Sequence, residues 1–247
     1  MSNTRTIIKN GFVVGVGKRD IAIEGQRVVQ SAELIEPAAD DKVIDAEGLV
    51  VAPAFVDVHV HLREPGYGYK ERIATGTMAA ARGGYSTVCS MPNLNPVPDS
   101  LENLRVQLDA IKKDAKINII PFGSITKGEK GNELSDLEEM APFVCGFSDD
   151  GVGVNDRGLM KEAMQRARAL DKVISAHCED ASQIKDSPEA EWKQIERDVK
   201  LADETKVKYH VCHISTKESV SIIFNQYALL CVHFQWTVLS FFHSVRF

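Results

Sequence analysis

The sequence predicts an α/β fold, namely an incomplete (β/α)8 TIM-like barrel that follows a small N-terminal β module. A length of 247 residues allows one large domain with an appendage. Up to residue 52, short strand-like runs alternate with turn residues, and from residue 53 apolar β-branched runs alternate with longer helical stretches, as in parallel sheets. We therefore divide the chain into a β module (1–52), a partial barrel (53–221) and an atypical apolar tail (222–247).

The β module is expected to begin with a hairpin. Residues 6–8 and 12–14 are apolar runs separated by Asn10-Gly11, a pair that suits a type I′ turn. Residues 20–24 alternate polar and apolar side chains, which indicates a half-buried strand. Together these features predict a small antiparallel β module.

The partial barrel is predicted from six strand-then-helix units. The expected strands span residues 54–60, 85–90, 117–122, 143–148, 173–176 and 207–212. The expected helices span residues 70–82, 101–115, 134–140, 158–170 and 190–204. Asp99 is expected to cap the second helix, and Gly83-Gly84 to end the first. Six such units in succession favour a barrel over a helix bundle.

The tail, residues 222–247, differs in composition from the rest of the chain. It is rich in apolar residues, has neither Gly nor Pro, and carries a single charge, Arg246. About 20 apolar residues suffice to cross a bilayer. Polar side chains interrupt the run at positions 225, 226, 233, 235 and 243, so we do not expect a membrane span. The strand and helix pattern is expected to stop here.

The composition narrows the classes of partner and location. The net charge of −6 and pI of about 5.7 disfavour a nucleic-acid partner. Five scattered cysteines without a C-x-x-C pair suggest a reducing compartment. The N-terminus lacks the apolar core of a signal peptide, so a cytoplasmic location is expected.

The segment VAPAFVDVHVHLREPG (51–66) is the first candidate for a functional site. His59 and His61 lie two residues apart near the end of a predicted strand, so their imidazoles should point to the same side. That geometry suits a metal ion. Arg63 follows in the same row and could hold an anionic substrate beside the metal.

Later strand ends supply further side chains of the types that zinc sites in hydrolases use. These are Asp149-Asp150, His177, and His210 with His213. Neighbouring aspartates face opposite ways on a strand, as do histidines three apart, so one member of each pair is expected to reach the centre. A carboxylate shared by two ions would complete a binuclear site. The alternatives are a turn for Asp-Asp-Gly and a structural role for a single histidine.

Several motifs together carry a resemblance to a known family. They are HVHLREPG (59–66), GGYSTVCSMPNLNPVPD (83–99), FSDDGVG (147–153), AHCED (176–180) and YHVCHIST (209–216). Over residues 5–221 the chain resembles a monofunctional bacterial dihydroorotase of the amidohydrolase superfamily. The resemblance implies a metal-dependent hydrolase barrel with two zinc ions per subunit. It also implies reversible opening of dihydroorotate to N-carbamoyl-L-aspartate in de novo pyrimidine biosynthesis.

The resemblance assigns roles to individual residues. His59 and His61 resemble the ligands of one zinc ion, and His177 and His213 resemble those of the other. Asp150 matches the carboxylate that bridges the ions. Superfamily relatives often use a carboxylated lysine there, so an aspartate favours this subtype over hydantoinase or allantoinase.

Two further residues match those that hold the substrate carboxylate, Arg63 and Asn93. A guanidinium pairs with a carboxylate through two parallel hydrogen bonds, which agrees with this role. The alternative for Asn93 is a turn residue between Pro92 and Pro96.

The sequence departs from the family pattern after residue 221. The family's zinc-binding aspartate that acts as acid and base, in an Asp-His-Ala-Pro-His-type motif, has no match, so no catalytic residue is assigned. Since a positioned acid/base contributes roughly 10²–10⁴-fold in rate, we expect impaired activity from an apparently truncated chain. The alternative is a non-catalytic dihydroorotase-like subunit that supports a partner enzyme. The expected ligand is a small molecule, and a homo-oligomer or a pyrimidine-pathway partner stays open.

Overall fold

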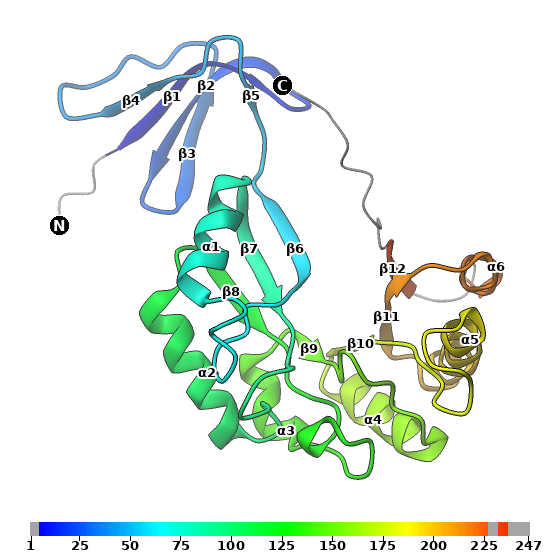
Figure 1. The fold of residues 1–247 in the computed structure, drawn as a ribbon. Helices are drawn as coiled ribbons and strands as arrows, with labels where there is room; N and C mark the ends of the chain where they lie inside the picture. The colour runs from blue at the N-terminus through cyan, green and yellow to red at the C-terminus, as the bar shows by residue number, and fades with distance from the viewer. Residues whose placement is uncertain (1–4, 227–231, 237–247) are drawn as a thin grey trace. The chain divides into compact units, whose positions relative to one another are not determined.

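The computed structural model describes residues 5–226 and 232–236 (Figure 1). The chain divides into two compact units, Met1–Ala54 and Phe55–Phe247. We describe each unit separately and call them the N-terminal and the C-terminal unit.

The N-terminal unit is a single five-stranded sheet. Its strands are β1 (Thr6–Val13), β2 (Gly17–Glu24), β3 (Arg27–Ala32), β4 (Lys42–Asp45) and β5 (Val50–Val51). The order is β3-β2-β1-β4, and β5 also pairs with β1. β1–β2 and β2–β3 are antiparallel, whereas β4 and β5 run parallel to β1, so the expectation of an antiparallel module is only partly correct. Ile7, Ala22 and Ile35 form its small core.

The predicted hairpin at Asn10-Gly11 is wrong. β1 continues through both residues, and the pairing register with β2 shifts between Ile8 and Gly11. Asn10 has φ +63°, and its backbone N–H donates to Asp20 Oδ1 at 2.8 Å. Asn-Gly supplies left-handed backbone for a turn or for a β-bulge, and here it forms a bulge. Gly11 is needed because a Cβ there would lie 2.4 Å from Val51 of β5.

The C-terminal unit alternates strands and helices. The strands are β6 (Phe55–Val60), β7 (Tyr85–Ser90), β8 (Asn118–Pro121), β9 (Gly146–Phe147), β10 (Val173–Ala176), β11 (Lys208–Ile214) and β12 (Val232–Trp236). The α-helices are α1 (Ile73–Arg82), α2 (Leu101–Asp114), α3 (Leu137–Met140), α4 (Arg157–Ala169), α5 (Pro188–Thr205) and α6 (Lys217–Gln226). Two short 3₁₀ segments are η1 (Lys127–Glu129) and η2 (Ala141–Phe143).

All strand pairs of this unit are parallel and follow the chain order. They form the sheets β6-β7-β8 and β9-β10-β11-β12, and a parallel bridge joins Gly123, after β8, to Phe147 of β9. The α/β prediction is therefore confirmed, while closure of the strands into a barrel stays a prediction. Parallel strands joined by helices bring their carboxyl ends to one edge, where binding sites of such folds lie.

The helix ends follow local capping chemistry. The N-cap of α2 is Ser100, whose hydroxyl accepts from the Asn103 N–H at 3.3 Å. The predicted cap, Asp99, instead accepts from the Asn103 side chain at 2.8 Å and from the Gly128 N–H at 2.9 Å, so it fixes the loop that contains η1. Gly83 and Gly84 end α1 as expected, with Gly84 at φ +85°.

The βα pattern does not stop at residue 221. Helix α6 extends to Gln226, and β12 pairs in parallel with β11. Thr216 accepts from the Ser219 N–H at 3.1 Å and so satisfies the start of α6, a signal that the apolar composition after residue 221 obscured. The rest of the predicted apolar tail, 227–231 and 237–247, lies outside the described residues. Over the described part of the chain, no helix is long and apolar enough to span a membrane.

The core of the C-terminal unit is densest around β9, β10 and β11. Phe147, Ile174 and Tyr209, one from each strand, are fully buried. Helices α4 and α5 cover them with buried apolar stripes that include Met160 and Ile195. The carboxyl ends of these three strands are thereby held in fixed relative positions.

Candidate metal centre

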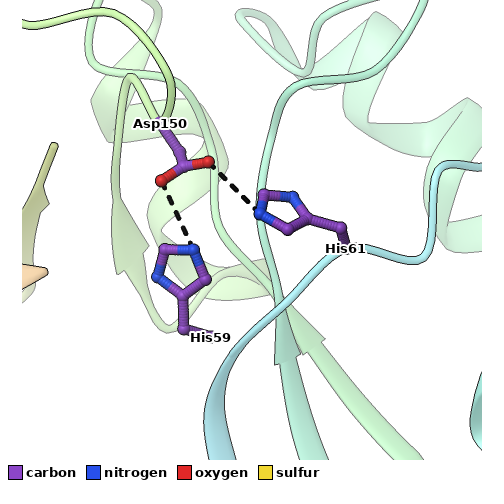
Figure 2. A group of neighbouring side chains, drawn as sticks. All are labelled: His59, His61 and Asp150. Carbon is purple, nitrogen blue, oxygen red and sulfur yellow. Dashed lines mark ion pairs between the residues drawn. The ribbon is translucent and has the colours of Figure 1, made fainter. Parts of the chain in front are cut away.

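Side chains from three strand ends meet around one carboxylate, that of Asp150, which itself follows a fourth strand, β9. His59 belongs to β6 and His61 follows it, while His213 lies in β11. His177 follows β10 directly. Figure 2 shows His59 and His61 on either side of the Asp150 carboxylate, with one imidazole facing each oxygen.

The distances divide the cluster into two groups that share Asp150. Asp150 Oδ1 lies 3.3 Å from His59 Nε2, and Asp150 Oδ2 lies 3.5 Å from His61 Nε2. On the other side, His213 Nε2 lies 3.4 Å from Asp150 Oδ1 and 3.2 Å from His177 Nδ1. Each group, His59–His61–Asp150 and Asp150–His177–His213, brings its donor atoms within 4.8 Å of one another.

These separations fit donors that share a metal ion. Tetrahedral zinc holds imidazole nitrogen and carboxylate oxygen at about 2.0–2.2 Å, which places neighbouring donors about 3.3–3.6 Å apart. The nitrogen–oxygen distances from Asp150, 3.3 to 3.5 Å, fall in this range. The donor set, neutral nitrogen with one carboxylate, is also the one that zinc prefers. The residues present therefore fit a divalent cation in each group.

The protonation states are those that metal binding requires. Burial lowers the pKa of His59 to about 4 and also lowers the pKa values of His61 and His177, so these imidazoles are neutral at pH 7. Burial alone would raise the pKa of Asp150, but the hydrogen bond from His213 and the nearby imidazoles lower it overall. A neutral imidazole and an ionised carboxylate can each offer a lone pair to a cation.

Only the second aspartate of Asp149-Asp150 faces the cluster. Asp149 turns the other way and accepts from the backbone N–H groups of Ile125 and Thr126 at 2.7 and 3.0 Å, as well as from the Thr126 hydroxyl. Burial raises the pKa of Asp149 to about 6 against these hydrogen bonds. Asp149 therefore fixes the loop after β8 and leaves Asp150 to the cluster.

The two histidines of β11 are also separated. His213 has φ +33°, and the pairing of β11 with β12 shifts register between Val211 and Ile214. His213 reaches Asp150, whereas His210 lines a different, largely apolar pocket of about 350 Å³ with Val58. The irregular backbone at His213 thus directs its imidazole to the centre.

Asn93 bridges the first group. Its Nδ2 donates to Asp150 Oδ2 at 3.0 Å, and its Oδ1 lies 3.0 Å from His61 Nδ1. Neutral His61 can donate from Nδ1 and leave the Nε2 lone pair toward Asp150, the arrangement found around metal-binding histidines. Asn93 is therefore an orienting partner of His61, a role that the sequence did not predict.

Arg63 brings an unpaired positive charge to the same side. It has φ +58°, uncommon for a residue other than glycine. Its guanidinium makes no hydrogen bond or ion pair within residues 5–226 and 232–236. Burial lowers the pKa of His61 and the charge of Arg63 lowers it further, so the guanidinium acts at short range. A cation with this environment can bind an anionic ligand.

Two acidic residues near the cluster were missed by the sequence predictions. Glu179 Oε2 lies 3.5 Å from His177 Nε2, which leaves Nδ1 to face His213. The spacing of Glu179 two residues after His177 could have indicated this contact. Glu129 has a buried Oε1 without a hydrogen-bond partner in the described structure. Burial and the charges of Asp149 and Asp150 raise the pKa of Glu129 to about 8.

Solved structures with this fold include L-hydantoinase (dihydropyrimidinase) from Arthrobacter aurescens and dihydropyrimidinase from Brevibacillus agri. The first has a TM-score of 0.79 at 22% identity and covers 94% of this chain and 58% of its own. The second has a TM-score of 0.80 at 20% identity and covers 96% and 59%. At these identities the likeness shows the α/β fold alone.

Sequence comparison gives the family. The model of the Dihydro-orotase-like family matches residues 48–189. Dihydroorotases from Staphylococcus epidermidis and Staphylococcus aureus are each 46% identical to this chain, over 239 and 238 residues, and cover 88% of it. The chain belongs to the dihydro-orotase-like family, as its motifs predicted. It spans about half the length of these relatives, since the matches cover 56% of each.

Proposed function

We propose that this chain carries the metal centre of a zinc-dependent cyclic amidohydrolase of the dihydroorotase type. The reaction would interconvert dihydroorotate and N-carbamoyl-L-aspartate in de novo pyrimidine biosynthesis. The observation that carries the proposal is the carboxylate of Asp150, shared by three imidazoles at 3.3–3.5 Å. The 46% identity to dihydroorotases supports this activity over others on the same fold.

Two zinc ions would be held by the two groups of donors. His59 and His61 would bind one ion, His177 and His213 the other, and Asp150 both. When bound, such a pair of ions polarises a carbonyl and activates water for attack on it. Asn93, which contacts the Nδ1 of His61, and Glu179, which contacts the Nε2 of His177, would orient these two imidazoles toward the ions.

Arg63, with Asn93 beside it, would bind the substrate carboxylate. The guanidinium forms no direct ion pair with an acidic residue among the described residues, although its charge acts on the carboxyl of Glu129, and this leaves it able to bind an anion. The amide of Asn93 already contacts His61 and Asp150. Asn93 would therefore contact the substrate from a position next to the metal ligands. The carboxylate would thereby orient the ring relative to the ions. We assign the acid/base role to no residue of this sequence.

The fold supports a wider proposal about architecture. We propose that the parallel strands β6–β12 belong to an amidohydrolase-type (β/α)8 barrel, with the β module at residues 1–52 and the metal-dependent hydrolase barrel from residue 53. The succession of parallel pairs and the bridge between Gly123 and Phe147 support one continuous row of strands. A cytoplasmic location is proposed as well, from the free cysteines.

Ligand binding separates this function from a hydantoinase-type one. We would load the chain with zinc and measure binding of dihydroorotate and of dihydrouracil, the same ring without the carboxylate, by calorimetry. We expect dihydroorotate to bind about 10–100-fold more tightly, because a charge-assisted contact contributes about 1.5–3 kcal/mol. Arg63→Ala should abolish the difference, whereas Arg105→Ala, at an exposed position of α2, should not. Equal binding of the two rings would overturn the assignment, and turnover of carbamoyl-aspartate is measured in parallel.

A further inference from the structure

One face of helix α5 carries polar side chains toward the protein interior. Glu191, Gln194 and Asp198 are spaced three and four residues apart and therefore lie on one side of the helix. Gln194 and Asp198 are 1% and 0% exposed. A buried polar side chain destabilises the fold unless it is hydrogen-bonded, so the partners of these residues indicate what they do.

Glu191 binds the segment that follows His213. Its carboxylate accepts from the backbone N–H groups of Ser215 at 3.0 Å and Thr216 at 3.1 Å. It also accepts from the hydroxyls of Ser215 at 2.5 Å and Ser219 at 2.6 Å. These contacts fix the chain two residues beyond His213. The backbone of β11 is irregular at His213 itself.

Gln194 binds both sides of the segment that contains His177. Its Nε2 donates to the carbonyl oxygen of His177 at 3.3 Å, and its Oε1 accepts from the N–H of Glu179 at 3.0 Å. The same Nε2 lies 3.3 Å from Asp198 Oδ2, which connects Gln194 to the next position of the helix face. The peptide groups around His177 are thus held by a single side chain.

Asp198 connects the helix to two more elements. It accepts from the Tyr209 hydroxyl on β11 at 3.0 Å and from Arg197 Nε at 2.7 Å. Arg197 in turn donates to the carbonyl oxygens of Val154 and Asn155 at 2.6 Å each. These two residues follow the Asp150 turn, so α5 contacts the strand-end loops that present Asp150, His177 and His213.

We propose that Glu191, Gln194 and Asp198 are positioning residues for the His177–His213 half of the metal centre. They set the backbone from which both imidazoles project, and this inference rests on the proposed metal-binding function. The His59–His61 half has no contact with these side chains; its orienting partner is Asn93. Substitution of Glu191 or Gln194, which bind the segments of His213 and His177, should therefore weaken one ion site and spare the other.

The test is stepwise metal binding by the full 247-residue chain. Gln194→Met removes the hydrogen bonds to His177, Glu179 and Asp198 at nearly constant volume. Glu191→Gln and Glu191→Ala remove the acceptors of Glu191 in two steps. Zinc and cobalt affinities are measured by competition with a chromophoric chelator, and bound metal by elemental analysis. Glu196→Gln is the matched control, because the Glu196 side chain is 46% exposed and, within residues 5–226 and 232–236, forms an ion pair only with Lys200 on the same helix.

We expect wild type and Glu196→Gln to bind two ions. Gln194→Met should bind the second ion about 10–100-fold more weakly at unchanged affinity for the first, the usual effect of losing an outer-shell partner. Glu191→Gln should fall between wild type and Glu191→Ala, which remains informative if Gln194→Met does not fold. Equal weakening of both ions, or no change in either, would overturn the positioning role. Failure of wild type to bind zinc would instead overturn the proposed function, and this inference with it.

Discussion

The two halves of the Asp150 cluster are built in different ways. His59 and His61 come from one strand end, and β6 leaves Phe55 62% and Val56 57% exposed. His177 and His213 come from two paired strands, β10 and β11, whose Ile174 and Tyr209 are fully buried. The first half depends on the two-residue period of a single strand, and the second on contacts between separate elements.

This difference teaches which kind of metal site is encoded locally. A strand places alternate side chains on one side whatever surrounds it, so an H-x-H pair is set by local geometry. In the second half, the two imidazoles meet only because β10 and β11 are in register and α5 holds the loops beyond them. The first half should therefore tolerate distant changes that the second does not.

The substitution expected to have the largest effect on metal binding is Asp150→Asn, because both halves of the cluster share this carboxylate. We expect affinity for each ion to fall at least about 100-fold, since an amide is a weaker and uncharged ligand. Metal content after dialysis against dilute zinc measures this loss. Asp149→Asn is the control: Asp149 bonds to Ile125 and Thr126, so its substitution should lower stability and leave two ions bound. Two ions retained by Asp150→Asn would contradict the shared-ligand assignment.

The next largest effect on metal binding is expected when one ligand is removed from either half in separate variants. His59→Ala and His177→Ala should each reduce the bound metal from two ions to one. In each variant the substituted group retains Asp150 and a single imidazole, while the other group is intact. The cobalt spectra of the two variants should differ and together approximate that of wild type. His210→Ala is the matched control from β11, since His210 lines the separate apolar pocket. Identical spectra from His59→Ala and His177→Ala would show that the halves are not distinct sites.

The sequence predicted the first half of the site better than the second, for the same physical reason. The H-x-H pair, the paired aspartates and the βα rhythm are local patterns, and the structure brings those residues together at Asp150. The partners of α5 could not be predicted, because polar residues at helical spacing usually indicate a solvent-facing surface. Glu191 and Gln194 bind backbone groups of segments whose proximity arises only on folding.

The errors in the fold have identifiable physical causes. Asn10-Gly11 is compatible with both a turn and a bulge, and the close approach of Val51, far along the chain, decides between them. Helix α6 begins at Lys217 and continues across residue 222, where the composition becomes apolar, so the helix and its capping by Thr216 were overlooked. The first error therefore reflects a distant contact, whereas the second reflects a local capping signal, between Thr216 and Ser219, that the change in composition overrode.

A smaller effect, on the free energy of unfolding, is expected from the buried hydrogen bond between Tyr209 and Asp198 behind the second half. Tyr209→Phe removes only the hydroxyl that donates to Asp198, whose pKa is raised by burial against its hydrogen bonds. We expect a loss of about 1.5 kcal/mol in the free energy of unfolding, the upper end of what one hydrogen bond contributes, because Asp198 Oδ2 still accepts from Gln194 Nε2. Urea denaturation measures it, with Tyr69→Phe as a control, because Tyr69 is 80% exposed. A value within experimental error of the control would mean that water replaces the lost donor.

The smallest expected effect tests the other buried acid, Glu129, which lacks the hydrogen-bond donors that Asp198 has. Its pKa in the folded, metal-free chain is about 8, against a usual value of 4.5. The folded state therefore binds one more proton than the unfolded state between these values. The stability contributed by this group is full below about pH 4.5 and is lost as the pH rises through 8.

Glu129→Gln keeps the shape of the side chain and removes the titration. Relative to wild type, the variant should gain about 1 kcal/mol between pH 5 and pH 9, less than the full shift implies because solvent reaches part of the side chain. Urea denaturation in the presence of a chelator, repeated across this range, measures the gain. Glu133→Gln is the control from the same loop, since Glu133 is 69% exposed. Parallel pH profiles for Glu129→Gln and wild type would mean that Glu129 is ionised in the folded chain. Glu129 and Asp198 would then be distinguished by the hydrogen bonds that Asp198 accepts from Tyr209 and Arg197.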